Sequence, residues 1–314
     1  MPVRYTLRQL EYFVAVGEYG SIAAASEKVN VSSPSISAAI SQLEDEFGLP
    51  LFVRKHAQGL SLTKAGHRLM NQSQVILREA DLLTSIAGDI SGNVQGPMSI
   101  GCLLTFAQMI LPKLRREFEI AYPSVRVSQS ELTQTEIFSQ IRKAELDVAL
   151  TYNLDIPSDL DFQPLVDLPP HVLVNEDHPL AGRESVSVED LAEHPMVLLD
   201  LPLSSDYFLS FFIQAGVRPR IAERTRDMAV MRSMVANGFG YSIANVRPLT
   251  DMSPDGGRLV FIPLTGNVRP MKMGLLMARG ADANSTVKAF VDHCRTLITE
   301  DYVPGMIVKD PPAQ

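Results

Sequence analysis

The chain has 314 residues, 46% of them hydrophobic and 20% charged, which is ordinary for a globular protein and long enough for two or three compact units. Its net charge of −8 argues against a protein that coats nucleic acid non-specifically. The sequence has no apolar run of the roughly 20 residues that span a bilayer and no secretory signal at its start. We therefore expect a cytoplasmic protein with no membrane partner.

Two short helices are predicted at the start of the chain. Thr6, with Gln9 three residues later, has the spacing of a capping box, and Gly20 ends the helix that they begin. The inward face of this helix is expected to hold Leu7, Leu10, Phe13 and Val14. Ser21 can cap a second helix, whose small residues let another helix approach closely.

A third helix is predicted from Ser33 as N-cap and Pro34 as first helical residue, and Gly48 ends it. Its inward stripe is Ile36, Ile40, Leu43 and Phe47. Its outward face over the first turns is expected to carry Ser33, Ser35, Ala38 and Ser41, with Ser37 beside them. Three short helices with a turn of about four residues before the last predict a helix-turn-helix.

A hairpin and a long helix come next. Residues 49–54 and 60–63 are short strand-like runs around a polar, partly basic tip, which is the pattern of a wing. Thr63 can cap a helix that reaches to about Gly88. Large apolar residues recur every seven positions at Leu62, Leu69, Ile76, Leu83 and Ile90. This seam indicates a helix packed along a partner, and an ordinary buried helix is the alternative.

An ordered set of motifs runs through residues 20–66. It consists of Gly20-Ser21-Ile22, Ala25-Ser26-Glu27, the S-x-S of Ser33–Ser35–Ser37, I-x-x-L-E at Ile40–Glu44, LF-x-R at Leu51–Arg54 and LT-x-A-G at Leu62–Gly66. With these motifs the chain resembles the LysR-type transcriptional regulators. The combination is specific, whereas any single piece would be weak.

The resemblance implies that the third helix enters the major groove of double-stranded operator DNA and that the wing grips the backbone. The implied DNA contacts are Ser21, Ser33, Pro34, Ser35, Ser37, Ala38 and Arg54. The family usually has Gln at the position of Ser33 and often a basic or amide residue at that of Ala38. We therefore expect DNA shape to carry more of the specificity here. For each serine, helix capping or solvation is the alternative.

Residues 94–314 alternate apolar runs with helical stretches, which predicts a mostly parallel α/β sheet. The motifs L-P-x-L, F-x-x-x-Y-P-x-V and L-D-V-A-L follow in order and resemble the sensor half of the same family. The resemblance implies a type 2 periplasmic-binding-protein fold, whose two lobes are joined by crossings near 165–173 and 261–277.

The expected fold class is an N-terminal α winged helix-turn-helix with a long linker helix, followed by a C-terminal α/β periplasmic-binding-protein-like domain of two lobes. We expect DNA binding in residues 1–63, a linker or dimerisation helix in 64–93 and effector binding in 94–314. Within the last part, lobe I takes about 94–168 and 274–302, and lobe II about 169–273.

Ligands of such folds bind beyond the carboxyl ends of parallel strands, where helix N-termini point their N–H groups. The predicted effector site has Thr105, Thr133, Ser204 and Ser205 as polar anchors, Leu104, Tyr152 and Met228 as apolar walls, and Thr151 on the rim. Each hydroxyl could instead only cap its helix. Arg226 is the single arginine placed near this site, which favours a small, partly apolar effector.

Other function classes lack support in the sequence. A transport-type solute-binding protein would need a signal peptide, and no P-loop, dinucleotide fingerprint, G-x-S-x-G or H-E-x-x-H indicates an enzyme. The histidines show no metal-ligand spacing, so we expect no metal and no cofactor. Cys102 and Cys294 are predicted to be buried hydrophobes, and a redox-sensing pair is the alternative. We therefore expect an effector-controlled regulator that forms a homodimer or homotetramer.

Overall fold

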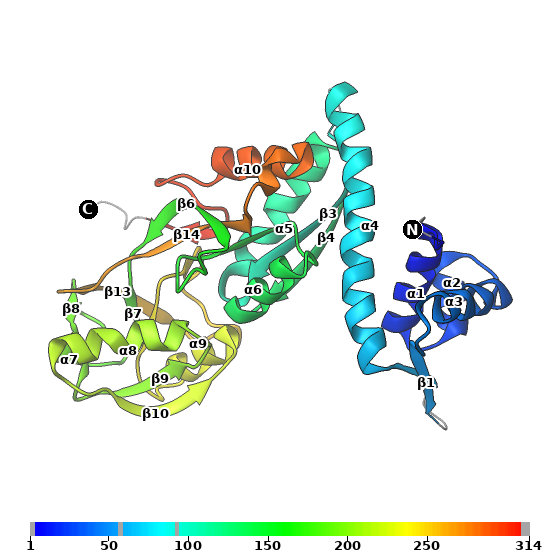
Figure 1. Cartoon of the computed structure of the whole chain (residues 1–314). Helices are drawn as coiled ribbons and strands as arrows, with labels where there is room; N and C mark the ends of the chain where they lie inside the picture. Colours follow the sequence, from blue (N-terminus) through cyan, green and yellow to red (C-terminus); the bar gives the residue numbers. More distant parts are fainter. Residues whose placement is uncertain (1–3, 56–58, 92–93, 309–314) are drawn as a thin grey trace. The chain divides into compact units, whose positions relative to one another are not determined.

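The computed structural model describes residues 4–55, 59–91 and 94–308. The chain divides into two compact units, one of Met1–Asn93 and one of most residues from Val94 onward. The first unit contains three short helices, a two-stranded hairpin and a long helix (Figure 1). In chain order these are α1 (Leu7–Tyr19), α2 (Ile22–Val29), α3 (Ser33–Phe47), β1 (Phe52–Lys55), β2 (Gly59–Leu62) and α4 (Lys64–Ser91).

Local sequence signals set the ends of the short helices. The Thr6 N–H donates to Gln9 Oε1 at 2.8 Å, and the Thr6 hydroxyl accepts from the Gln9 N–H, which confirms the capping box. Gly20 and Gly48 end α1 and α3 with φ near +64°, a conformation that costs glycine little. The hydroxyl of Ser21 caps α2, as expected.

Two expectations for these helices are wrong in detail. The N-cap of α3 is Ser32, whose hydroxyl accepts from the Ser35 N–H, so Ser33 and Pro34 are the first two helical residues. Proline is tolerated there because the N–H groups of the first turn have no helical partner. Leu7 is 46% exposed and lies outside the core, because the buried face of α1 runs through Leu10, Phe13, Ala15 and Val16.

The core of the first unit joins the inward faces of the three short helices to the first half of α4. Ile36, Ile40 and Leu43 of α3 are buried in it, as the stripe predicted. Leu69 and Ile76 of α4 pack against the same core. Gly66 has to be glycine, because a Cβ there would lie 2.2 Å from the carbonyl oxygen of Leu51.

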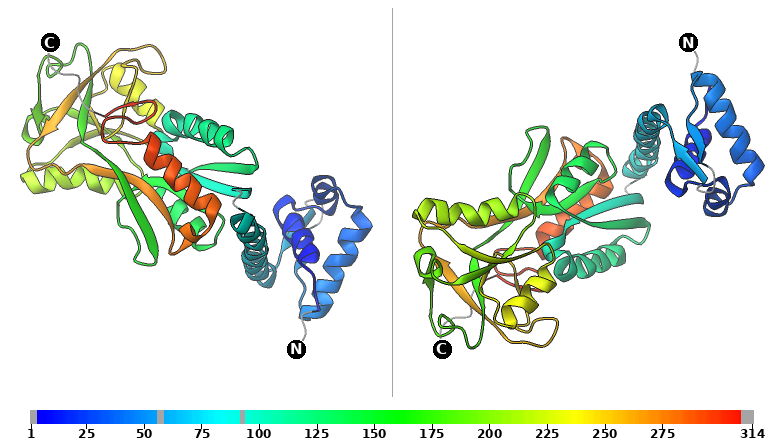
Figure 2. Two further views of the ribbon diagram at one scale, coloured as in Figure 1. Left: turned by 90° about the horizontal axis from the view of Figure 1, so that it is seen from above. Right: turned by 90° about the horizontal axis from the view of Figure 1, so that it is seen from below.

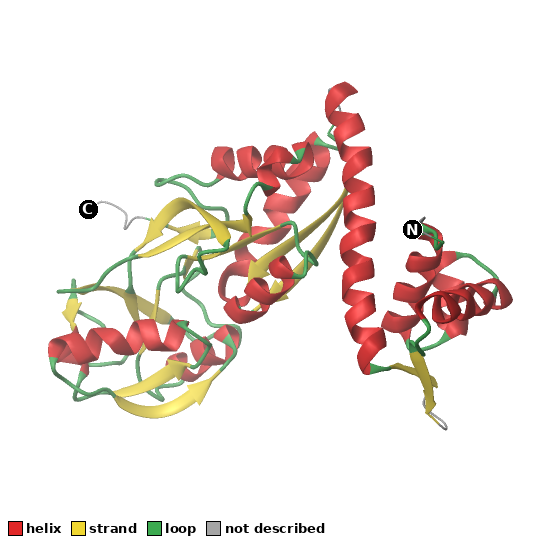
Figure 3. Cartoon of the chain, in the orientation of Figure 1, coloured by secondary structure: helices red, strands yellow, loops and turns green. Residues whose placement is uncertain are grey.

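The second unit has a first lobe built on a five-stranded sheet of order β4-β3-β5-β14-β6. Strand β3 pairs parallel with β4 and β5, whereas β14 pairs antiparallel with β5 and β6. Helices α5, α6 and α10 pack against this sheet (Figure 3). The elements are β3 (Gly96–Leu103), α5 (Leu104–Ala121), β4 (Val125–Leu132), α6 (Gln134–Arg142), β5 (Val148–Tyr152), β6 (Leu160–Leu168), β14 (Met271–Ala278), η1 (Ala281–Ala283) and α10 (Ser285–Leu297).

The second lobe has a four-stranded sheet of order β11-β7-β13-β8 and a parallel pair, β9 with β10. The Val197 N–H donates to the Tyr241 carbonyl at 2.8 Å, which links the two groups of strands. The elements are β7 (His171–Asn175), β8 (Val186–Ser187), α7 (Val188–Leu191), β9 (Pro195–Leu199), α8 (Ser204–Ala215), β10 (Arg220–Thr225), α9 (Met228–Ala236), β11 (Ser242–Ala244), β12 (Arg247–Pro248) and β13 (Leu259–Thr265).

The expectation of mostly parallel sheets is wrong. Strand β7 is antiparallel to both β11 and β13, and β14 is antiparallel to both of its neighbours. The chain leaves the first lobe from β6 into β7 and returns from β13 into β14, so the outgoing and returning strands run in opposite directions. These crossings consist of residues 169–170 and 266–270 and lie inside the ranges expected from the sequence.

Helix α10, drawn in red, returns to the first lobe beside α5 (Figure 2). The ring of Phe290 packs edge-on against Phe118 of α5, with the ring centroids 5.1 Å apart. A short strand, β15 (Met306–Ile307), then pairs antiparallel with β12 of the second lobe. The C-terminal segment is therefore a third connection between the lobes, which the sequence did not predict.

Candidate functional site

The outward face of α3 is the candidate DNA-binding surface. Pro34, Ser35, Ser37 and Ala38 are exposed on it, and Ser33 is half-buried. The Ser35 hydroxyl lies 2.8 Å from that of Ser32, so it takes part in the cap. Ser21 caps α2 and is also half-buried. Ser37 has no such capping role among the described residues, which leaves its hydroxyl available to a partner.

The hairpin is held to α3 by polar contacts. The Glu44 carboxylate accepts from the backbone N–H groups of Leu51 at 2.7 Å and Phe52 at 3.2 Å. The Thr63 hydroxyl donates to the Pro50 carbonyl at 2.8 Å and accepts from the Gly66 N–H at 2.8 Å. Glu44 of the I-x-x-L-E motif and Thr63 of the LT-x-A-G motif thus hold the two ends of the wing in place. Arg54 belongs to β1, but its side chain and the tip at 56–58 lie outside the described residues.

The heptad seam of α4 changes character along the helix. Its first half packs in the core of the first unit, whereas Leu83 is 69% exposed and Ile86 is 44% exposed. The side chain of Ile90 lies outside the described residues. Two large apolar side chains exposed on one helix are the kind of surface that another helix covers.

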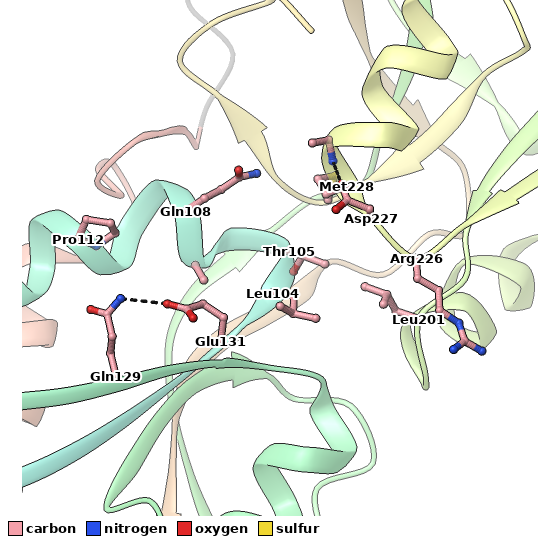
Figure 4. Close-up of a pocket in the computed structure, with 12 residues that line it drawn as sticks. Leu104, Thr105, Gln108, Pro112, Gln129, Glu131, Leu201, Arg226, Asp227 and Met228 are labelled. Atoms are coloured by element: carbon pink, nitrogen blue, oxygen red, sulfur yellow. Dashed lines mark hydrogen bonds between the residues drawn. The ribbon is translucent and has the colours of Figure 1, made fainter. Parts of the chain in front are cut away.

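A cavity of about 380 Å³ lies between the two lobes of the second unit. The first lobe contributes residues of α5 and β4 to it, and the second lobe contributes the start of α9 (Figure 4). Its walls are Leu104, Thr105, Ala107, Gln108, Pro112, Gln129, Glu131, Leu201, Arg226, Asp227, Met228 and Ala229. Leu104, Thr105 and Met228 of the predicted effector site are therefore brought together.

Thr105 is the most informative residue of this cavity. It was expected to cap α5, but the N-cap is Leu103, which offers no side-chain hydrogen bond, so the first turn is uncapped. Thr105 is only 4% exposed, and its hydroxyl has no partner of hydrogen-bonding geometry among the described residues. Burial raises the pKa of the Tyr152 hydroxyl, and the nearby Thr105 side chain lowers it in part.

The helix of the second lobe that starts at the cavity, α9, has a side-chain cap, unlike α5. The Asp227 carboxylate caps α9 by accepting from the N–H groups of Ala229 at 2.7 Å and Val230 at 3.0 Å. Glu131, on the opposite wall, accepts from Gln129 Nε2 at 2.9 Å. Arg226 lines the cavity but points away from Thr105 (Figure 4). Two carboxylates and one outward-turned arginine make the cavity negative rather than positive.

The other predicted site residues do not line this cavity. Thr133 forms a capping box with Glu136, whose pKa these hydrogen bonds lower. Thr151 donates to Gln134 Oε1, and Tyr152 is buried at the end of β5. Ser205 donates to the Leu201 carbonyl at 3.0 Å, and Ser204 beside it is buried.

Several residues escaped the sequence reasoning. Gln108, Gln129 and Glu131 line the cavity, and only the period-two alternation of β4 could have indicated the last two. Gln134 is 1% exposed, and its amide donates to the Tyr152 carbonyl at 2.9 Å. A buried glutamine after a helix cap leaves no pattern in the sequence.

The two cysteines are both fully buried, as small hydrophobic residues would be. Burial raises the pKa of Cys102, and the nearby Glu131 carboxylate raises it further. Burial also raises the pKa of Cys294, with a smaller contribution from Cys102. Both side chains are therefore thiols rather than thiolates at neutral pH.

No helix in 4–55, 59–91 or 94–308 is long and apolar enough to cross a membrane. Within the same ranges, no three His, Cys, Asp or Glu side chains cluster as metal ligands would.

Residues 7–67 match the family model of the bacterial regulatory helix-turn-helix protein, lysR family, and residues 91–298 match that of the LysR substrate binding domain. The hydrogen peroxide-inducible genes activator of Pectobacterium carotovorum subsp. carotovorum is 30% identical over 238 residues, which are 76% of this chain and 78% of that protein. OxyR, a DNA-binding transcriptional dual regulator of Escherichia coli (strain K12), is 28% identical over 92% of this chain and 94% of its own length.

A solved structure extends the similarity to three dimensions. HinK, a LysR family transcriptional regulator from Pseudomonas aeruginosa, superposes with a TM-score of 0.63 at 35% identity. The match covers 94% of this chain and 99% of that chain. Both units are therefore included in the similarity.

Proposed function

The chain belongs to the LysR family of DNA-binding transcriptional regulators with an effector-binding domain, and from this premise we propose that the cavity between its lobes is the effector site. The observation that carries this proposal is the Thr105 hydroxyl, which is buried in the cavity wall and has no partner of hydrogen-bonding geometry among the described residues. Such a group costs about 1–3 kcal/mol when it stays unpaired, and an effector that bonds to it removes this cost.

The effector is a small, partly apolar molecule that is uncharged or carries an amine. Leu104, Leu201 and Met228 supply apolar walls, and Glu131 and Asp227 supply negative charge. A carboxylate would face both of these acidic side chains, whereas the guanidinium of Arg226 turns away. Leu104, Thr105 and Met228 contact the effector in this proposal, and Gln108 and Glu131 set its polar selectivity. Thr133, Thr151, Tyr152, Ser204 and Ser205 hold the walls in place.

Thr105→Val tests this assignment, because valine keeps the shape and removes only the hydroxyl. Without effector, the variant is expected to unfold at a higher urea concentration than the wild type. A thermal-shift screen of small neutral and amine compounds then identifies those that stabilise the wild type and fail with the variant. Thr135→Val, on the exposed side of α6, is the matched control. A lower stability of Thr105→Val would mean that its hydroxyl already has a partner, and the proposal would be wrong.

DNA binding is assigned to the outward face of α3, with Ser37 and Ala38 at its centre. Ser21, Ser33, Pro34, Ser35 and Arg54 complete the expected contact set. Ser37→Glu places a negative charge toward the phosphates and is expected to abolish a gel shift on the DNA beside the gene. Ser139→Glu, on an exposed position of α6, is the control. Equal shifts by both variants would contradict the assignment.

In this proposal the chain forms a homodimer through the face of α4 on which Leu83 and Ile86 are exposed, and a homotetramer would need a second interface. Leu83→Glu is expected to reduce the assembly size in analytical ultracentrifugation. Leu249→Glu is a matched control, because Leu249 has the same exposed fraction of 69%. If the assembly mass of Leu83→Glu equals that of the wild type, α4 does not form the interface.

The remaining assignments rest on the family. Residues 1–63 bind DNA, 64–93 link and dimerise, and 94–314 sense the effector. Because its target is genomic DNA, the protein works in the cytoplasm, and it regulates transcription rather than catalysing a reaction. Effector binding closes the two lobes and changes the spacing of the paired DNA-binding domains and the bend of the DNA. A footprint and bend that stay constant with effector would contradict this switch.

A further inference from the structure

A second cavity, of about 260 Å³, lies where the chain crosses between the lobes. It shares no wall residue with the effector cavity. Its walls come from the first crossing and the strand ends beside it, from β13, from the segment after β11 and from the C-terminal segment. They are Leu168, Pro169, Pro170, His171, Asn245, Arg247, Phe261, Pro263, Leu264, Ile307 and Val308. Most of these side chains are apolar, so the few polar groups determine what can bind.

The first polar group is the side chain of Asn245, which is 5% exposed. Its Nδ2 donates to the Leu168 carbonyl at 2.6 Å and to the Tyr207 hydroxyl at 3.2 Å. These contacts fix the orientation of the amide, because a flipped amide would turn its oxygen toward the Leu168 carbonyl oxygen. Oδ1 has no hydrogen-bond partner among the described residues and remains a buried acceptor.

The second polar group is the imidazole of His171, which is 9% exposed. Burial and the neighbouring guanidinium of Arg247 lower its pKa to about 3, although the Pro169 and Val246 carbonyls accept hydrogen bonds from the ring and raise the pKa. The ring is therefore neutral at physiological pH. Nε2 has no partner among the described residues, so Nδ1 carries the proton toward the carbonyls and Nε2 is an acceptor.

The charged group at this cavity is Arg247. Its guanidinium lies over the ring of Phe261 at 5.3 Å, and that of Arg232 lies over the same ring at 5.8 Å. His171 packs against Phe261 as well, at 5.3 Å between ring centroids. The positive charges of Arg247 and Arg232 both act on His171, which disfavours an ammonium group as the donor to this ring.

The C-terminal segment closes one side of this cavity. Gly305 lies so close to the Met109 carbonyl of α5 that a Cβ would be 2.6 Å from its oxygen. Two residues later, Ile307 pairs with Arg247 in the β12–β15 ladder. The segment is thus attached to both lobes, and Ile307 and Val308 complete the apolar wall.

We propose that this cavity at the crossings binds a compact hydroxy acid with an apolar body. Its hydroxyl donates to His171 Nε2 or Asn245 Oδ1, its carboxylate pairs with Arg247, and its body lies among the prolines, Leu264, Phe261 and Val308. A simple carboxylate cannot donate to either acceptor, because an ionised carboxyl group has no proton. This site is additional to the effector site and does not depend on it.

The test uses the full-length protein and isothermal titration with mandelate and the three hydroxybenzoate isomers as probes. Benzoate and phenylacetate are matched compounds without a hydroxyl, and benzyl alcohol is one without a carboxylate. At least one hydroxy acid is expected to bind, and its matched compounds are expected to bind at least tenfold more weakly. A crystal structure with the bound probe is expected to place it against His171 and Asn245.

Three variants locate the binding. Val308→Trp fills the cavity from its half-exposed edge and is expected to abolish probe binding, and Ile120→Trp, on an exposed position of α5, leaves it unchanged. Thr105→Val, in the other cavity, is expected to retain it. The proposal is overturned if no probe binds, if the matched compounds bind equally well, or if Thr105→Val abolishes binding that Val308→Trp retains. A crystal structure with the probe elsewhere overturns it even if Val308→Trp fails to fold.

Discussion

The carboxylate of Glu44 accepts a hydrogen bond from the backbone N–H of Leu51 at 2.7 Å. This contact joins the last turns of α3 to the chain that enters the hairpin. A half-buried acidic side chain therefore helps to hold the wing in place relative to α3.

Glu44→Ala is expected to lower the free energy of unfolding of the N-terminal unit. Hydrogen bonds to charged groups contribute about 1.5–3 kcal/mol, and the variant leaves the N–H groups of Leu51 and Phe52 without this acceptor. Urea unfolding followed by circular dichroism measures the change, and DNA affinity is expected to fall with it. Glu46→Ala, at an exposed position of the same helix, is the control. Equal stability of the two variants would show that the contact is unimportant.

The N-cap of α3 is Ser32 and not the neighbouring Ser33. Ser32→Ala removes the capping hydroxyl and is expected to destabilise the helix by about 1 kcal/mol, whereas Ser33→Ala is expected to change little. Hydrogen exchange of the α3 backbone amides, read by mass spectrometry, resolves the two. Faster exchange in Ser33→Ala than in Ser32→Ala would mean that Ser33, and not Ser32, caps α3.

Both thiols are expected to be unreactive in the folded protein. Burial raises the pKa of Cys102 and of Cys294, so at pH 8 each has less thiolate than an exposed cysteine. A disulfide reagent such as DTNB is expected to label neither thiol in the native chain and both in urea. Hydrogen peroxide at concentrations that oxidise exposed thiols is expected to leave DNA binding unchanged. Rapid native labelling of both would instead favour the redox pair.

His171 is expected to make the protein less stable in mild acid. Its pKa is about 3 in the folded protein and near 6.5 when unfolded, so between these values the unfolded chain binds the extra proton. The stability that neutral His171 provides is complete above about pH 6.5 and falls by up to about 1.4 kcal/mol per pH unit below it.

Urea titrations at pH 7 and pH 5 measure this loss in the wild type and in His171→Gln, which cannot titrate. The wild type is expected to lose more stability than the variant between the two pH values. The comparison isolates His171 from His178, whose pKa burial and His194 also lower. An equal loss in both proteins would mean that His171 is already protonated at pH 5.

The sequence by itself determined the features that depend on neighbours along the chain. The capping box of Thr6 and Gln9, the helix ends at Gly20 and Gly48 and the buried stripe of α3 follow from spacing within one or two turns. The ordered motifs also sufficed for the family, because they record packing constraints such as the contact between Gly66 and the Leu51 carbonyl. The one-residue error at the N-cap arose because Ser32 and Ser33 cap equally well in principle.

Only the tertiary structure decided the candidate sites, because their residues meet across elements that are distant in sequence. Sequence reasoning placed hydroxyls at helix starts, but whether a hydroxyl bonds within the protein depends on its neighbours in space. Thr133 and Thr151 form side-chain hydrogen bonds, whereas Thr105 has no partner of hydrogen-bonding geometry in the part of the chain that the structure describes. His171 and Asn245, 74 positions apart in the chain, line one cavity beside the first crossing and the C-terminal segment. No local pattern encodes that meeting, since it depends on how the two lobes are joined.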